Sequence, residues 1–227
     1  DWSSDVCSSD LFLGLWLGDG TSLEPSITTI DDEIINYLKD YAEENNLFLT
    51  NSGSITYRIS SKNSTKVKAT NINDNSFEIF ESISDLCDVK NISRSLINDV
   101  LSGKQKQTHG YKVEIIDKYN NAILEGLKKY DLLNNKHIPS DYKTNSVDNR
   151  LKLLAGLIDS DGYLYKHKKG YEISQKNTKL FDDIVFLCRT LGLSVRVQKD
   201  KIINGSIYKR CSIFGSILEK IPVKLDR

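Results

Sequence analysis

The segment LLAGLIDSDG, residues 153–162, decides how this chain is read, because LFLGLWLGDG at residues 11–20 repeats its pattern. In both segments an apolar stretch of helical length is followed by an acidic residue and then by glycine, a common helix stop. Gly14 and Gly156 fall at the same position in the two segments. Small residues there would let two helices pack backbone against backbone, as they do in membrane helix pairs.

The residues that follow each segment also repeat. An order of helix, strands, helix and strands occurs twice, which is an internal duplication of an α+β unit. The predicted elements are strand 27–30, helix 31–45 and strands 47–50 and 54–60 in the first copy, and strands 163–166 and 171–174, helix 178–191 and strands 193–198 and 207–214 in the second. If the two segment helices run parallel, Asp19 and Asp161 come together at one edge of the fold.

The overall charge hides a regional asymmetry. The chain has 227 residues, with 31 Lys and Arg against 31 Asp and Glu, and its composition excludes a disordered or collagen-like chain. No apolar run approaches the roughly 20 residues of a membrane span. Residues 11–50 carry eight acids and one base, whereas residues 131–227 carry eleven acids and eighteen bases. The later part of the chain therefore favours an anionic partner.

The N-terminal stretch is treated separately. Residues 1–10, DWSSDVCSSD, have no periodic apolar face, and we interpret them as a non-native or disordered tail. The chain contains no Met, so we expect it to be a piece of a longer reading frame or a processed product. The four cysteines are far apart without CxxC spacing, which argues against a zinc site and fits a reducing, intracellular compartment (cytoplasm or nucleus).

The two segments resemble the paired motifs of the LAGLIDADG homing endonucleases, and the second copy is nearly verbatim. The lead-in over residues 136–164, with a Lys-x-Ile-Pro element, and the ending over 220–225 resemble the intein-encoded branch of that family. The resemblance implies an α+β fold of two pseudo-symmetric αββαββα halves. We assign them to residues 11–65 and 119–227, the latter including the linker.

The resemblance also implies one catalytic, metal-binding acid in each motif, Asp19 and Asp161, with the backbone carbonyls of Gly18 and Ser160 as further ligands. Two neighbouring carboxylates repel each other unless a cation lies between them. Mg²⁺ (or Mn²⁺) prefers such oxygen ligands together with water and phosphate oxygens. The ion can generate hydroxide and neutralise charge on a scissile phosphate.

A catalytic lysine is implied for each half. Lys136 matches the lysine of the Lys-x-Ile-Pro element, and Lys224, with Lys220 as the alternative, is our candidate in the second half. A cation near the metal can stabilise developing charge or polarise the attacking water. The first motif has Leu17 where the second has Asp159, so we expect the halves to differ in cleavage rate.

The stretch between the two halves is longer than one α+β unit needs. Residues 66–118 predict two strands and then two short helices, beginning near Ser82 and Ser93, in a helix-turn-helix pattern. The segment is similar to the modular DNA-binding repeats of intron-encoded nucleases. Its predicted DNA-binding residues are Arg94, Ser95, Asn98, Lys104 and Lys106.

The family's curved sheets lie along the DNA major groove, so cations on the strands are candidate DNA contacts. Side chains alternate between the two faces of a strand, which leaves one face for DNA and one for the helices. Some cations would contact only phosphate. The candidates are Arg58 and Lys62 in the first half and Lys166, Lys168, Lys169, Arg196, Lys199, Lys201, Lys209 and Arg210 in the second.

Two functions are compatible with these patterns. The first is a site-specific, Mg²⁺-dependent double-strand DNA endonuclease, acting as a monomer on its target and not on membranes. The second is a non-cleaving nucleic-acid binder of the same fold, either an RNA maturase or a degenerate nuclease. Intein splicing halves are not evident in the sequence. We expect them to be absent or to lie in a larger precursor.

Overall fold

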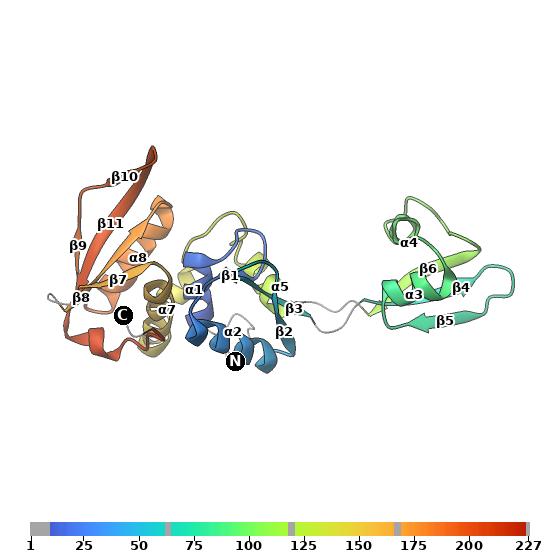
Figure 1. Ribbon diagram of the computed structural model, residues 1–227, viewed down its shortest axis with the longest axis horizontal. Coiled ribbons are helices and arrows are strands. Elements are labelled where there is room, and N and C mark those ends of the chain that lie inside the picture. Colours follow the sequence, from blue (N-terminus) through green and yellow to red (C-terminus); the bar gives the residue numbers. More distant parts are fainter. Residues whose placement is uncertain (1–9, 62–64, 118–120, 166–168, 226–227) are drawn as a thin grey trace. The chain divides into compact units, whose positions relative to one another are not determined.

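The computed structural model describes residues 10–61, 65–117, 121–165 and 169–225, and the chain forms two compact units. The first unit contains residues up to Ser60 and from Ala122 onward, and the second, which we call the inserted unit, spans Ser61–Asn121 (Figure 1). The described helices of the first unit are α1 (Asp10–Asp19), α2 (Asp32–Glu44), α5 (Ala122–Lys129), α6 (Ser140–Lys143), α7 (Val147–Asp161), α8 (Thr178–Thr190) and the 3-10 helix η2 (Ser216–Lys220). Its described strands are β1 (Ser26–Thr28), β2 (Leu47–Asn51), β3 (Thr56–Ser61), β7 (Gly162–Tyr165), β8 (Gly170–Gln175), β9 (Ser194–Val197), β10 (Lys201–Ile203) and β11 (Ser206–Phe214).

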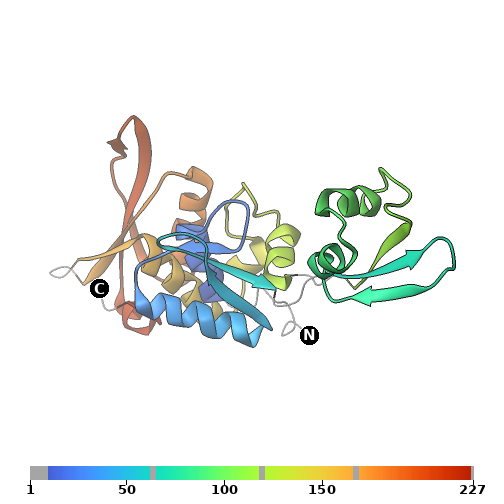
Figure 2. The same cartoon turned by 45° about the vertical axis from the view of Figure 1, so that its right-hand side comes forward.

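Helices α1 and α7 form the centre of the first unit, with one sheet on either side of the pair (Figures 1 and 2). Seven consecutive residues of α1, Leu11 to Leu17, are buried, as expected of a helix that is apolar on every side. The two helices touch through glycine, because a Cβ atom on Gly14 would lie 2.2 Å from the Leu153 carbonyl oxygen. The predicted backbone-to-backbone packing is therefore present.

The two sheets have a helix on one face and differ in size. The first has the order β1-β3-β2, and the second has the order β10-β11-β8-β7, with β9 also paired to β11. In the second half two strands, β7 and β8, separate α7 from α8, as predicted. In the first half only β1 and an isolated bridge between Gly20 and Ile27 separate α1 from α2. The α+β class is confirmed, but the full αββαββα order is not met in the first half.

Asp10 does not belong to the tail in which we had placed it. It is the first residue of α1 and is buried, and burial raises the pKa of its carboxyl to about 6. An acidic residue in the first turn of a helix interacts favourably with the helix dipole. Asp10 therefore belongs to α1 and not to the predicted tail.

The inserted unit has its own core. Its antiparallel sheet has the order β5 (Phe77–Phe80), β4 (Lys66–Asn71) and β6 (Tyr111–Asp117), packed against α3 (Ile83–Lys90) and α4 (Arg94–Leu101). The Ser82 hydroxyl caps α3 by accepting the Asp85 amide at 2.8 Å, and Asn91 ends it in the left-handed conformation. Strand β6 was not predicted, and neither were β10, α5 and α6.

Within the described ranges, every helix is too short or too polar to span a membrane.

Replacing Gly156 by alanine tests the central packing. A Cβ atom there would lie 2.3 Å from the Leu11 carbonyl oxygen and 2.6 Å from the Leu15 nitrogen. Both are helix backbone atoms, so α1 would have to move, and we expect Gly156→Ala to lower the free energy of unfolding by about 1–3 kcal/mol. Gly53→Ala is the matched control, because its Cβ would find no atom closer than 3.9 Å. Equal stability of the two variants in denaturant unfolding would contradict this packing.

Candidate active site

Asp19 and Asp161 lie at the adjoining C-terminal ends of α1 and α7. The close approach is visible at Gly18, where a Cβ atom would lie 2.0 Å from Ser160 Oγ and 2.8 Å from Asp161 Oδ2. Asp19 is exposed and Asp161 is partly buried. The parallel packing of two similar helices thus places an acid from each motif at the same edge, where each influences the other electrostatically.

The surroundings of Asp161 disfavour its ionised form. Burial and the negative charge of Asp19 raise the pKa of the Asp161 carboxyl to about 7, although the Lys136 charge and a hydrogen bond from the Gln175 side-chain amide act in the opposite direction. Two carboxylates held this close repel each other, and a bound cation would relieve the repulsion. Without a cation, the ionised forms of Asp19 and Asp161 therefore repel each other at this site.

The Lys136 ammonium lies at the end of α1. It donates hydrogen bonds to the carbonyl oxygens of Leu17 at 3.1 Å, Gly18 at 3.4 Å and Gly20 at 2.7 Å, and lies 4.9 Å from the Trp16 ring centroid. A cation is favoured here because the last carbonyls of a helix have no partner within it. Burial lowers the pKa of the Lys136 amine to about 8, while the charges of Asp161 and Asp19 partly counteract that shift.

The linker around Lys136 is anchored to α8. The Asn177 side chain donates to the Lys136 carbonyl oxygen at 2.9 Å. Asp183 accepts the Ile138 amide at 2.9 Å and forms an ion pair with Lys143 at 2.7 Å. Lys136 therefore has its backbone held by a helix of the second half and its side chain at the end of a first-half helix.

The donor atoms at this edge suit a hard divalent cation. The described residues contain no group of three or more His, Cys, Asp or Glu side chains that could hold a metal. Two carboxylates would leave most coordination positions to water and phosphate oxygens, which is how Mg²⁺ is usually bound. The Ser160 hydroxyl does not take part, because it donates to the Gly156 and Leu157 carbonyl oxygens within α7.

The structure does not bring Lys224 to the acids. Its ammonium lies 5.3 Å from the Tyr37 ring centroid on α2. Its backbone amide and that of Leu225 donate to the Asp159 carboxylate, at 2.7 and 3.1 Å. Asp159 thus secures the C-terminal segment, and the alternative, Lys220, is exposed in η2.

Gln175 is a site residue that the sequence reading missed. It ends β8, is 9% exposed, and donates its side-chain amide to Asp161 Oδ2. The available signal was a polar residue at a strand position that alternation assigns to the buried face, next to Ile173. Gln175 lies two residues before Asn177, the N-cap of α8. The residue at the same place before the N-cap of α2 is Thr29, whose hydroxyl accepts the Asp31 amide. The residue type at this position therefore differs between the two halves.

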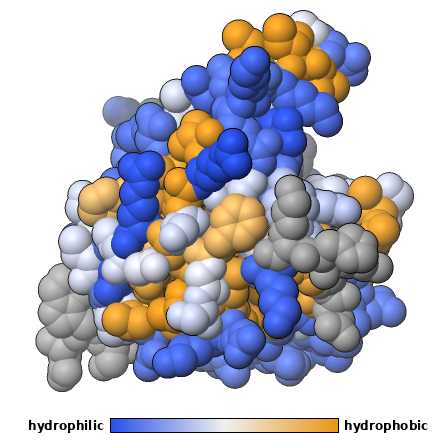
Figure 3. Space-filling model, turned by 90° about the vertical axis from the view of Figure 1, so that its left-hand side faces the viewer, coloured by the Kyte–Doolittle hydropathy of each residue, from blue (hydrophilic) through white to orange (hydrophobic). Residues whose placement is uncertain are grey.

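One face of the second-half sheet is open. Ile173, Cys211 and Ile213 are buried, whereas the alternate residues of β8 and β11 are partly buried, apart from Gly170 and Ser212, which are buried. We call this second side the open face; Arg210 lies on it. Figure 3 shows hydrophobic patches among hydrophilic side chains on this side of the protein, including one at the top, where the β10–β11 hairpin carries exposed Ile202 and Ile207.

The remaining predicted DNA contacts are spread over the strands. Lys169, Arg196, Lys199 and Lys201 are exposed, whereas Lys209 lies beside α8 rather than on the open face and pairs with Asp200 at 3.2 Å. Arg58, on β3, is ion-paired with Glu24. The three other predicted positions, Lys62, Lys166 and Lys168, lie outside the described residues.

In the inserted unit, the predicted residues follow the exposed side of α4 and the turn after it. Arg94 donates to Ser84 Oγ at 2.9 Å, Ser95 Oγ lies 3.1 Å from Ser93 Oγ, and Lys104 pairs with Asp99 at 3.5 Å. All the predicted side chains are exposed, namely Arg94, Ser95, Asn98, Lys104 and Lys106.

Comparisons with known proteins find a family match and relatives for parts of the chain. Residues 137–218 match the homing endonuclease family model. The chain is 28% identical over 211 residues to the homothallic switching endonuclease of Saccharomyces cerevisiae, covering 88% of this chain and 30% of that protein. It is 31% identical over 104 residues to the ATP-dependent DNA helicase Hel308 of Methanocaldococcus jannaschii, covering 42% of this chain and 9% of that protein. The chain thus spans less than a third of either relative.

The fold is also shared with solved structures. A structure from a study of mesophilic variants of the homing endonuclease I-DmoI has a TM-score of 0.50 at 14% identity, covering 96% of this chain and 91% of that one. A second, of an I-DmoI variant with its nicked target DNA and Mn, has a TM-score of 0.50 at 13% identity, covering 96% and 97%. Residues 137–218 therefore resemble the homing endonuclease family in sequence, and the chain shares its fold with the I-DmoI structures.

The shifted pKa of Asp161 predicts a pH effect on stability in metal-free buffer. Its folded-state pKa, about 7, exceeds the ordinary 3.8, so ionisation is harder in the folded protein. Stability should fall as the pH rises from about 4 to about 7. Asp161→Asn removes this penalty, so it should be stabilising by about 2–4 kcal/mol above pH 7 and nearly neutral below pH 4. Unfolding at several pH values measures this difference.

The matched control is Asp182→Asn, which removes an exposed carboxylate of α8. Its effect on stability should not follow the same curve. If wild type and Asp161→Asn differ by a constant free energy of unfolding across this pH range, the predicted destabilisation by ionised Asp161 is contradicted.

Proposed function

We propose that the chain is a site-specific double-strand DNA homing endonuclease of the LAGLIDADG type that hydrolyses phosphodiester bonds with Mg²⁺ (or Mn²⁺). The observation that carries the proposal is the placement of Asp19 and Asp161 at one edge, beside Lys136. The homing endonuclease match over residues 137–218 and the I-DmoI fold support it. The resemblance to intein-encoded members leads us to propose an element of that branch. Activity on DNA would place the protein in the cytoplasm or nucleus.

In this proposal Asp19 and Asp161 hold the ion, and the carbonyl oxygens of Gly18 and Ser160 are further ligands, although that of Gly18 also accepts from the Lys136 ammonium at 3.4 Å. A bound divalent ion would supply hydroxide from water and neutralise charge on the scissile phosphate. Gln175 fixes the orientation of the Asp161 carboxylate through its amide. Because both acids come from one chain, a monomer has the parts needed to cut both strands.

Lys136 would act on the charge that develops during cleavage. Its amine is held by three carbonyl oxygens within the electrostatic influence of both acids. A preorganised cation at such a point stabilises a transition state without having to reorient during the reaction. Because its pKa is about 8, the amine can exchange a proton near neutral pH. Lys224, the candidate lysine of the second half, does not take a matching place in the described structure, since its ammonium lies 5.3 Å from the Tyr37 ring centroid.

Plasmid cleavage tests the proposed reaction. We expect the chain to linearise plasmid DNA that carries the uninterrupted host site in Mg²⁺ and to leave it intact in EDTA. Asp19→Asn and Asp161→Asn should each abolish linearisation and keep DNA binding, because the carboxylates hold the ion and not the duplex. Lys136→Met should slow cleavage by about 100-fold or more.

Lys179→Met, which removes an exposed cation of α8, is the matched control and should cleave normally. Because Gln175 binds Asp161 and the corresponding chain position in the first half is Thr29, the wild-type reaction should pass through a nicked intermediate. Sequence-specific binding without any cutting in Mg²⁺ would rule out the nuclease and indicate a non-cleaving binder, an RNA maturase or a degenerate nuclease.

We further propose that the inserted unit adds DNA contacts through its helix-turn-helix. The support is its exposed polar surface on α4, with Arg94, Ser95 and Asn98, and the lysines of the following turn, Lys104 and Lys106. Side chains from a second helix of this kind can reach bases in the major groove.

Deleting the inserted unit tests this role. Lys66 and Asp117 are paired across β4 and β6, so the chain enters and leaves the unit at neighbouring points. Residues 66–117 can therefore be replaced by a short Gly-Ser linker. We expect DNA affinity to fall by about tenfold or more, because several contacts are lost. Arg94→Ala with Asn98→Ala in the full chain should reproduce part of the loss. Unchanged affinity and specificity in gel-shift titrations would contradict a DNA role.

A further inference from the structure

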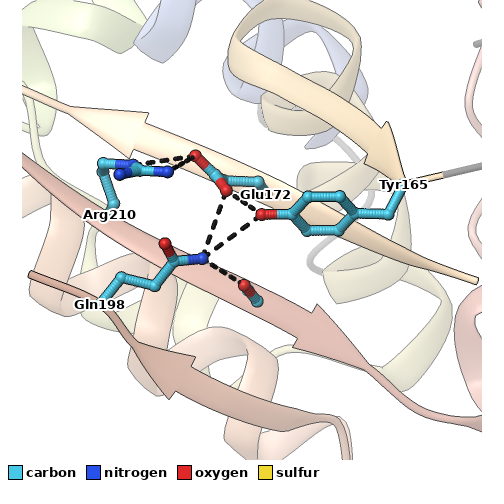
Figure 4. Close-up of polar contacts among 5 residues, drawn as sticks. Tyr165, Glu172, Gln198 and Arg210 are labelled. Carbon is cyan, nitrogen blue, oxygen red and sulfur yellow. Dashed lines mark hydrogen bonds and ion pairs between the residues drawn. The ribbon is translucent and has the colours of Figure 1, made fainter. Parts of the chain in front are cut away.

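A network of polar side chains crosses the open face of the second-half sheet (Figure 4). The Glu172 carboxylate on β8 is at its centre. Its Oε1 atom accepts hydrogen bonds from Arg210 Nε at 2.9 Å and Nη2 at 2.6 Å. Its Oε2 atom accepts from the Tyr165 hydroxyl and, at 3.2 Å, from Gln198 Nε2. The network lines a hollow of about 660 Å³.

A carboxylate is an unexpected residue on a surface proposed to approach phosphates. The Glu172 side chain is only 15% exposed, and its charge is balanced by Arg210. The pair is therefore neutral and adds little attraction to a phosphate backbone. By contrast, Arg196 and Lys199 line the same hollow, are exposed and have no ion-pair partner among the described residues. These two cations can supply the general attraction to DNA. Arg210, whose charge is balanced by Glu172, is not needed for it.

The Arg210 guanidinium retains hydrogen-bonding capacity at its outer edge. A guanidinium carries five N–H donors, and Glu172 accepts from two of the nitrogens. The part of the chain that the structure describes gives Arg210 no other acceptor for its Nη1 donors. Those donors and the second Nη2 hydrogen form a flat fork, held in one orientation by the bidentate pair. Such a fork matches the O6 and N7 acceptors of guanine in the major groove.

We propose that Arg210 reads a guanine in the second half of the target site and that Glu172 is the positioning residue that orients it. This inference rests on the proposed function, because it requires that the open face meets DNA. The carboxylate stabilises one rotamer of a long side chain before DNA binds, so less side-chain entropy is lost in the contact. It also keeps the arginine from turning toward a phosphate, which would weaken sequence reading.

The first half does not repeat this arrangement at the equivalent place. Ser52 follows β2 as Gln198 follows β9, so the two residues correspond. The Ser52 amide donates to the Thr56 carbonyl oxygen, and the Gln198 amide donates to that of Arg210. Thr56 is therefore the counterpart of Arg210. The first-half ion pair, between Arg58 and Glu24, lies two residues further along its strand. The guanine read by Arg210 should therefore have no symmetry-related partner in the other half-site.

Selection from a randomised duplex library, with Ca²⁺ in place of Mg²⁺ to limit cutting, tests the inference. The full wild-type chain should enrich a guanine at one position of one half-site. Arg210→Lys keeps the charge and loses the fork, so the preference at that position alone should fall by about tenfold to a hundredfold. Arg189→Lys, at an exposed arginine of α8, is the matched control and should leave every position unchanged.

Glu172→Gln separates positioning from a merely structural role. The freed arginine should weaken guanine preference while affinity for unselected duplexes is kept or increased. The salt dependence of binding should steepen by about one unit, because one more cation can meet phosphate. A wild-type preference that survives Arg210→Lys would overturn this inference and leave the proposed function standing. No sequence enrichment by the wild-type chain would overturn the proposed function and the inference with it.

Discussion

The contact between the backbones of α1 and α7 is the constraint on which the first unit depends. Gly14 and Gly156 leave no room for a Cβ atom, so the helices approach until main-chain atoms touch. Because the helices run parallel, this contact fixes their C-terminal ends and brings Asp19 and Asp161 to one edge. The mutual repulsion of the acids, the lysine bound at the end of α1 and the proposed metal site all follow from that approach.

The two halves share a scaffold, but their sites differ. Gln175 hydrogen-bonds to Asp161, whereas the hydroxyl of the corresponding Thr29 accepts the Asp31 amide. Lys136 is bound at the end of α1, and Lys224 is held away on Tyr37. The second-half sheet also has more strands than the first. Since each strand of a duplex needs its own nucleophile and leaving-group environment, this asymmetry is the structural basis for proposing that the strands are cut at unequal rates.

Sequence patterns predicted much of this structure because hydrophobic periodicity and glycine positions are local signals. The duplicated motif, the central helix pair, α2, α8 and most strands follow from them. Features that depend on distant partners did not follow. Strand β6 forms because β4 offers its edge, Lys224 turns toward Tyr37, and Gln175 finds Asp161 only after the sheet folds against α7. The isolated bridge between Gly20 and Ile27, which takes the place of a second strand between α1 and α2, was likewise not predicted.

The most direct measurement of the central claim is the position of a divalent ion in crystals of this chain soaked with Mn²⁺. Anomalous scattering locates the ion without reference to any functional assay. The account predicts density in contact with carboxylate oxygens of both Asp19 and Asp161, and its loss in Asp161→Asn. An ion bound elsewhere, or bound equally well in Asp161→Asn, would contradict the account.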